Sequence, residues 1–328
     1  MTPEHVFLLL GAAVVVYTLT GGADFGGGVW DLLARGPRKD AQRDALAHAI
    51  APIWEANHIW LIFLVVLQFT VFPKAFHATS VALHVPLTAA LVGIVLRGAA
   101  FAFRSYGFDT ITWRRTWGRV FAVASLLTPI CLGLSLAALA TGDIRWDGVR
   151  VTSGFFVGWT TPFALLTGLM TAALAATLAA VYMTAETEGD LRADFRRRAL
   201  GAQAVTVLLG GAVLAAAHRD APDFAAAFGW QPLLPGTVAL GVTVGALVTD
   251  RPRLARFGVA VQGVGVVAGW GLGMQGHLVR PDLTLHVAGA RPAVLEPLLP
   301  ALLIGGAVLA PSLWYPGQSH LSRPPAVR

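Results

Sequence analysis

Residues 6–33 read VFLLLGAAVVVYTLTGGADFGGGVWDLL, and residues 50–72 read IAPIWEANHIWLIFLVVLQFTVF. Each stretch is long and apolar enough for an α-helix to cross the hydrocarbon core of a bilayer, which takes about 20 residues. Hydropathy windows find seven further stretches of this kind, at about 78–103, 118–140, 159–183, 199–217, 232–249, 256–277 and 294–315. The sequence therefore predicts an all-α, polytopic membrane protein with about nine transmembrane helices in a bundle.

The composition excludes a soluble protein. Of the 328 residues, 55% are hydrophobic and only 13% are charged, whereas about a quarter of the residues in soluble domains are charged. No polar segment is long enough for a separate aqueous domain. We expect a single integral membrane domain over 1–328, either continuous or built from two four-helix bundles at about 6–140 and 155–278 with a last helix at 294–315.

The distribution of basic residues predicts the orientation. The formal net charge is +6, and in a membrane protein such charge gathers in the loops on the cytoplasmic side, so it gives no reason to expect a nucleic-acid partner. When loops are assigned to alternate sides, the basic residues of one side are Arg35, Arg38, Lys39, Arg43, Arg104, Arg114, Arg115, Arg119, Arg192, Arg196, Arg197, Arg198, Arg251, Arg253, Arg256, Arg323 and Arg328. Those of the other side are Lys74, Arg145, Arg150, Arg219, Arg280 and Arg291. This bias predicts an N-terminus outside and a C-terminus in the cytoplasm.

Three ionisable residues fall inside predicted spans: Asp24 in the first, Glu55 in the second and Arg97 in the third. A charge at the centre of a membrane helix costs about 2.5 to 3.5 kcal/mol, so such a residue faces the bundle interior and either pairs or takes part in function. At a rise of about 1.5 Å per residue, all three lie roughly 8 to 15 Å below the cytoplasmic surface. Short loops make consecutive helices neighbours, so we expect the three to form one cluster.

Polar residues surround Glu55 in the segment WEANHIW, residues 54–60. Glu55 and His58 are three residues apart and share a helix face. With an arginine nearby, such a cluster can hold exchangeable protons near neutral pH, which suits proton transfer through Asp24 and Glu55. The supporting residues would be Trp54, Asn57, His58 and Arg97. The alternative is an acid paired with Arg97 only to fix helix packing.

Other motifs favour packing over ligand binding. The run GGADFGGG at 21–28 lacks the lysine and the strand of a phosphate-binding loop, whereas glycines four residues apart, such as Gly22 and Gly26, let membrane helices approach closely. His84 and His277 could ligate a haem by position, but a lone histidine in a span is more often a hydrogen-bonded packing residue. His58 and Glu55 lack two further metal ligands at a predictable spacing.

Several segments, in their order along the chain, resemble the second subunit of cytochrome bd quinol oxidases. They are GGADFGGG (21–28), APIWEANHIWLI (51–62), FTVFP (69–73), LRG (96–98), FR (103–104), FF (155–156), TPF (161–163) and DLT (282–284). The first two segments are long and specific. The others are short, and they support the resemblance because they occur in the same order along the chain. The resemblance covers most of the chain.

The resemblance implies a subunit of a bacterial cytoplasmic (inner) membrane oxidase that takes electrons from quinol and reduces dioxygen to water. In this family the haems b and d belong to the first subunit, so the resemblance implies that this chain binds no cofactor or metal of its own. It also implies a heterodimer with that haem-bearing subunit, contact with membrane lipids, and in some complexes a small accessory membrane subunit. Asp24 and Glu55 match the acids of the family's proton path from the cytoplasm; many members carry Asp at the second position.

Two other functions stay open at the level of the sequence. A proton-coupled transporter acting alone would also place carboxylates beside glycines in its spans, although the acidic motif has no second copy after Asp143. A purely structural membrane subunit with buried ion pairs is the other alternative.

Overall fold

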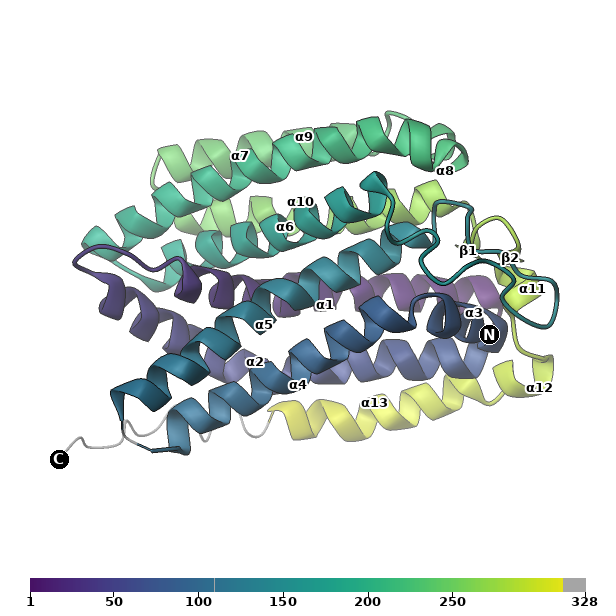
Figure 1. The fold of residues 1–328 in the computed structure, drawn as a ribbon, viewed down its shortest axis with the longest axis horizontal. Helices are drawn as coiled ribbons and strands as arrows, with labels where there is room; N and C mark the ends of the chain where they lie inside the picture. The colour runs from purple at the N-terminus through teal and green to yellow at the C-terminus, as the bar shows by residue number, and fades with distance from the viewer. Residues whose placement is uncertain (109, 315–328) are drawn as a thin grey trace.

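The chain forms a bundle of long helices that run along one axis (Figure 1), as shown by a computed structural model. The structure describes residues 1–108 and 110–314, with the side chains of 50–56, 105–106 and 309–314 left out. The helices are α1 (Pro3–Leu32), α2 (Lys39–Val71), α3 (Pro73–Ala82), α4 (His84–Tyr106), α5 (Ile111–Ala138), α6 (Pro162–Glu186), α7 (Gly189–Asp220), α8 (Pro222–Phe228), α9 (Leu233–Val248), α10 (Pro252–Met274), α11 (Leu285–Ala288), α12 (Pro292–Leu295) and α13 (Leu298–Trp314). A hairpin of β1 (His277–Val279) and β2 (Leu283–Thr284) joins α10 to α11.

Each of the nine predicted spans overlaps a helix of at least 16 residues, and the predicted all-α membrane fold is confirmed. By length and composition, six helices of the described residues qualify as membrane spans, and up to eight do if each bent pair counts as one. The bent pairs are α2 with α3 and α8 with α9. The apolar helical stretch at 292–308 is shorter, so the ninth span, like the orientation of the termini, stays a prediction.

The third predicted span begins later than expected. Residues 78–82, assigned to its start, belong to α3, which bends by 118° away from the second half of α2. The break falls at Phe72, because Pro73 has no backbone N–H to continue the α2 hydrogen-bond ladder and instead occupies the first turn of α3. Hydropathy does not reveal this break, since the buried residues of α3 are mostly alanines.

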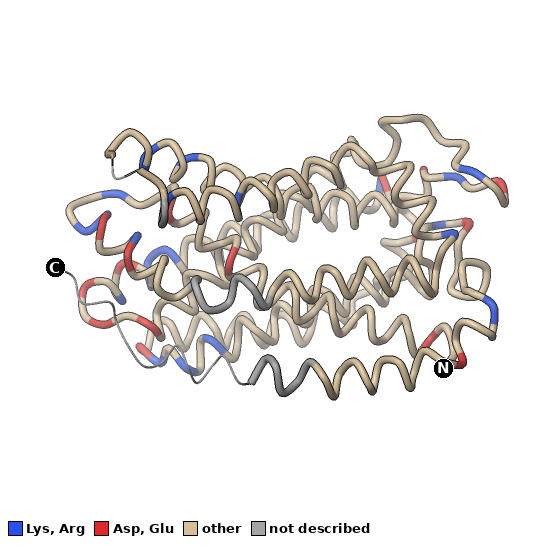
Figure 2. Tube along the Cα trace, turned by 90° about the horizontal axis from the view of Figure 1, so that it is seen from below, with Lys and Arg blue, Asp and Glu red and all other residues tan. Residues whose placement is uncertain are grey.

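The two ends of the bundle differ in their charges. Figure 2 shows that charged residues gather at both ends and leave the middle almost free of them. We call the end where α1, α4, α6 and α9 finish the arginine-rich end, because the basic residues assigned to the cytoplasmic side lie there; Arg323 and Arg328 are outside the described residues. The separation of charges predicted from the loops is thus present in the fold.

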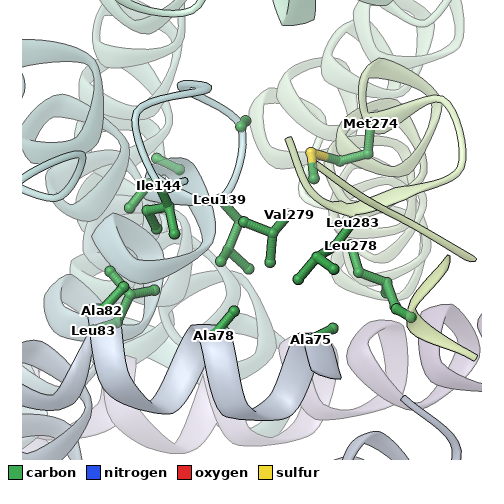
Figure 3. Packing of buried hydrophobic residues seen from close by; sticks show 14 of the residues in the cluster. Ala75, Ala78, Ala82, Leu83, Leu139, Ile144, Met274, Leu278, Val279 and Leu283 are labelled. Atoms are coloured by element: carbon green, nitrogen blue, oxygen red, sulfur yellow. The ribbon is translucent and has the colours of Figure 1, made fainter. Parts of the chain in front are cut away.

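The opposite end is covered by a compact cap. Figure 3 shows alanines of α3 packed beneath the β1–β2 hairpin and the loop that follows α5. Asp282, between the two strands, ties these parts together: its carboxylate accepts bonds from Arg145 Nε at 2.9 Å and from the Trp146 backbone N–H at 2.8 Å. The cap seals one end of the apolar core and leaves the arginine-rich end as the more polar surface.

Close packing of α1 on α6 holds the centre of the bundle together. A Cβ atom built on Gly26 would overlap the backbone carbonyl of Ala175, and one on Gly22 would touch the Leu178 side chain at 3.3 Å. Near the same crossing, Trp30 Nε1 donates to the Ala176 carbonyl at 2.7 Å. The interpretation of this glycine run as a packing motif is therefore confirmed.

Candidate functional site

A buried ion pair between α1 and α4 lies in the apolar interior. Both side-chain guanidinium Nη atoms of Arg97 donate to the Asp24 carboxylate, Nη1 to Oδ2 at 2.5 Å and Nη2 to Oδ1. Asp24 is 4% exposed and Arg97 is 2% exposed. Bidentate geometry of this kind suits a guanidinium, whose planar fork matches the two carboxylate oxygens. The expected contact between these two residues is present.

Arg97 has further contacts that do not depend on the Asp24 carboxylate. Its Nη2 also donates to the Asp24 backbone carbonyl at 3.0 Å, and its Nε donates to Ser125 Oγ at 2.9 Å. The rings of Phe25 and Phe121 face the guanidinium, with their centroids 5.0 and 4.9 Å from Cζ. Hydrogen bonds and cation–π contacts therefore hold this cation from α1 and α5 as well as through the ion pair.

The second-span motif contributes Asn57, whose Nδ2 donates to Asp24 Oδ2 at 3.3 Å. Asn57 is buried and His58 is half-buried. Trp54 and Glu55 belong to α2, but their side chains lie outside the described residues. Of the predicted cluster, the structure thus brings together Asp24, Asn57 and Arg97, and the position of the Glu55 carboxyl group stays a prediction.

A second ion pair lies closer to the arginine-rich end and was not predicted. Asp31 is 7% exposed; its carboxylate lies 3.3 Å from Arg104 Nη1 and 3.5 Å from Arg43 Nε. Asp31 follows Asp24 by seven residues on α1, and Arg104 follows Arg97 by seven residues on α4. Seven residues are about two helical turns, so each helix carries its two charges on one face. This matched spacing is visible in the sequence and could have revealed the second pair.

The two pairs form a polar column that leads inward from the arginine-rich end. At a rise of about 1.5 Å per residue, Asp31 and Asp24 are about 10 Å apart along α1. The distance is too long for one hydrogen bond, so transfer between these carboxylates would need water or another side chain between them. Along this column, the arginines compensate the negative charge of the two buried carboxylates.

Ligands for a metal do not cluster in the described part of the chain, where no three His, Cys, Asp or Glu residues lie close enough to hold an ion. His84 is exposed, its Nδ1 lies 2.8 Å from the Val81 carbonyl, and its ring packs against Phe155. His277 Nδ1 lies 3.1 Å from the Met274 carbonyl. Both contacts are of the packing kind that the sequence favoured for these histidines.

Fold and site together define an integral membrane protein whose helix bundle holds paired charges in its interior. The chain belongs to the cytochrome bd terminal oxidase subunit II family, whose sequence profile matches residues 2–316. This confirms the resemblance found in the sequence motifs.

Known relatives agree with this assignment, and one solved structure has the same fold. The chain is 27% identical over 205 residues to cytochrome bd-I ubiquinol oxidase subunit 2 of Escherichia coli K12, a match that covers 62% of this chain and 53% of that protein. A putative cytochrome bd menaquinol oxidase subunit II of Bacillus subtilis is 22% identical over 330 residues, covering 92% and 90%. A chain of the bd oxidase from Geobacillus thermodenitrificans has the same fold, with a TM-score of 0.80, 20% identity and coverage of 98% and 99%.

Proposed function

We propose that this chain is the non-haem subunit of a bd-type quinol:dioxygen oxidoreductase. It would stabilise a haem-bearing first subunit, which carries the haem b and haem d groups, in a heterodimer of the bacterial cytoplasmic membrane; a small accessory subunit could join the complex. The family match over residues 2–316 carries this proposal. The arginine-rich end would face the cytoplasm, in keeping with the positive-inside bias.

We assign proton uptake to the polar column. Reduction of dioxygen to water consumes protons, and the column gives a route from the arginine-rich end toward the interior of the bundle. Asp24 and Glu55 would carry the protons, with Arg97 and Asn57 holding Asp24 in place. Asp31 and Arg104 would form the outer part of the route.

The contacts of Arg97 support transfer through Asp24. A proton that reaches Asp24 neutralises its carboxylate and removes the counter-charge of Arg97, which is costly for a buried cation. Ser125, the Asp24 carbonyl and the two phenylalanine rings do not change with protonation, so they continue to hold the guanidinium. The pair can therefore lose one charge without losing its geometry.

A structural role is the second candidate, and the closed bidentate pair of Asp24 with Arg97 favours it. A buried pair that only locks α1 to α4 would be needed for assembly and not for turnover. Variants that remove each acid separate the two functions.

The assignment to an oxidase is tested by purification of the chain from its own membrane in mild detergent. We expect it to copurify with a haem-bearing polypeptide, and we expect the reduced-minus-oxidised spectrum of the complex to show haem b and haem d bands together with quinol oxidase activity. Isolation of the chain without any haem protein would reject the assignment.

Replacement of the proposed proton carriers should slow turnover without loss of the complex. Glu55→Gln keeps the shape of the side chain and removes its exchangeable proton, so we expect quinol oxidase activity to fall by about ten- to a hundredfold at unchanged haem content. Asp24→Asn should slow turnover similarly, and it should also lower the stability of the complex because Arg97 loses its counter-charge. Glu188→Gln is the matched control, because this exposed glutamate lies at the arginine-rich end, outside the column. Normal activity of Glu55→Gln would refute a necessary proton role, and loss of haem and assembly in both acid variants would favour the structural role.

A further inference from the structure

An open pocket of about 330 Å³ lies at the arginine-rich end, between the loop that joins α1 to α2 and the first turns of α7. It is separate from the polar column. The side chains that line it include Arg35, Arg38, Gln42, Asp194, Arg197 and Arg198. Four cations therefore surround this pocket with one acidic side chain among them.

The carboxylate of Asp194 is already fully used by its neighbours. Its two oxygens accept bonds of 2.8 Å from Nε and Nη2 of Arg38, a bond of 3.0 Å from Gln42 Nε2 and one of 3.2 Å from Arg197 Nη2. Arg38 also donates to Asp190 at 3.2 Å. These two acids bond only Arg38 and Arg197 of the four arginines, which leaves the pocket with a local excess of positive charge.

Arg198 has one hydrogen-bond donor atom without an acceptor in the part of the chain that the structure describes. Its Nη2 donates to Gln42 Oε1 at 2.6 Å, and its guanidinium packs on the ring of Trp30 with Cζ 5.3 Å from the centroid. Its Nη1 is buried and donates to no group of the described residues. A buried charged donor without an acceptor is costly, so this guanidinium adds uncompensated positive charge to the wall of the pocket.

Arg35 lines the pocket and is exposed. No ion pair of Arg35 is found among the described residues. The turn that places it beside Arg38 depends on Gly36, whose φ of +84° is strained for residues with a side chain. The short loop thus presents two arginines toward the first turns of α7.

We propose that this pocket binds a phosphate group. Phosphate offers several acceptor oxygens and negative charge, which match the forked donors of arginine better than a neutral ligand does. The pocket lies where α1 ends and α7 begins. With the arginine-rich end at the cytoplasmic membrane surface, as proposed above, this is the level of the lipid headgroups. The phosphate can belong to the headgroup of an anionic phospholipid in the adjacent leaflet or to a soluble phosphate compound.

The test uses the purified complex that contains the full chain. Native mass spectrometry after reconstitution with phosphatidylglycerol or with phosphatidylcholine measures the lipid that is retained, and the shift of the thermal unfolding midpoint with inorganic phosphate at constant ionic strength measures binding of the soluble anion. Arg198→Gln and Arg35→Gln should each weaken binding about tenfold or more, the effect of losing one charge-assisted hydrogen bond. Arg253→Gln, an exposed arginine at the same end and outside the pocket, should bind as the unchanged protein does.

Each outcome decides the proposal. If the unchanged protein retains phosphatidylglycerol and both pocket variants lose it, the ligand is a lipid headgroup. If inorganic phosphate binds but no lipid is retained, the ligand is a soluble phosphate. Equal binding by the pocket variants and the Arg253→Gln control overturns the proposal. Absence of both ligands also overturns it, and then an acidic segment of the partner subunit would be the occupant to seek. Arg35 is exposed, so its variant keeps the test valid even if Arg198→Gln fails to fold.

Discussion

Replacing Arg97 by methionine is expected to destabilise the folded chain by about 3 to 5 kcal/mol, the cost of breaking a buried ion pair by removal of one partner. The Asp24 carboxylate would stay buried in an apolar region without its counter-charge, and Asn57 alone could not compensate it. Methionine keeps much of the length of the side chain, so loss of packing contributes little. The measurement is the thermal unfolding midpoint of the purified protein in detergent, with the yield of monodisperse protein as a second readout.

Two further variants show whether charge is the cause. Arg253→Met removes an exposed arginine at the arginine-rich end and should change the midpoint little. The double variant Asp24→Asn with Arg97→Met removes both charges, so it should recover a large part of the lost stability. An Arg97→Met protein as stable as the parent would contradict the view that this pair supports the fold.

Gly26→Leu is expected to be the most damaging substitution at the α1–α6 crossing. It should lower the free energy of unfolding by at least about 3 kcal/mol, the upper end of the usual cost of overpacking a core. A side chain at this position meets the backbone carbonyl of Ala175, which cannot rotate away, so the two helices must separate. Gly26→Ala should cost less but should still destabilise. Unfolding midpoints and the yield of folded protein measure both effects.

Gly11 gives a matched control on the same helix. A Cβ atom there meets nothing within 4 Å, and alanine is about 1 kcal/mol better than glycine inside a helix. Gly11→Ala should therefore be neutral or stabilising, opposite in sign to Gly26→Ala. The same sign of change at both positions would show that helix propensity, and not close packing, controls the effect.

Much of the candidate site could be predicted from the sequence. A charge inside an apolar stretch is costly wherever it occurs, so Asp24 and Arg97 stand out without any structure. Asp31 and Arg104 were missed because they lie near span ends, where charges are common, although their spacing repeats that of Asp24 and Arg97. Ser125, Phe25 and Phe121 give no such signal, since serine and phenylalanine are ordinary residues of membrane helices.

The sequence by itself determined that this protein crosses the membrane, which stretches are helical and which end of the bundle is basic, because hydropathy and loop charge depend on local composition alone. Only the tertiary structure decided that Asp24 pairs with Arg97, that α2 breaks at Phe72 and that four arginines surround one pocket. These features depend on the direction and rotation of each helix relative to its neighbours. Packing contacts between residues far apart in the chain fix that arrangement, so it cannot be predicted from the pattern of neighbouring residues in the sequence.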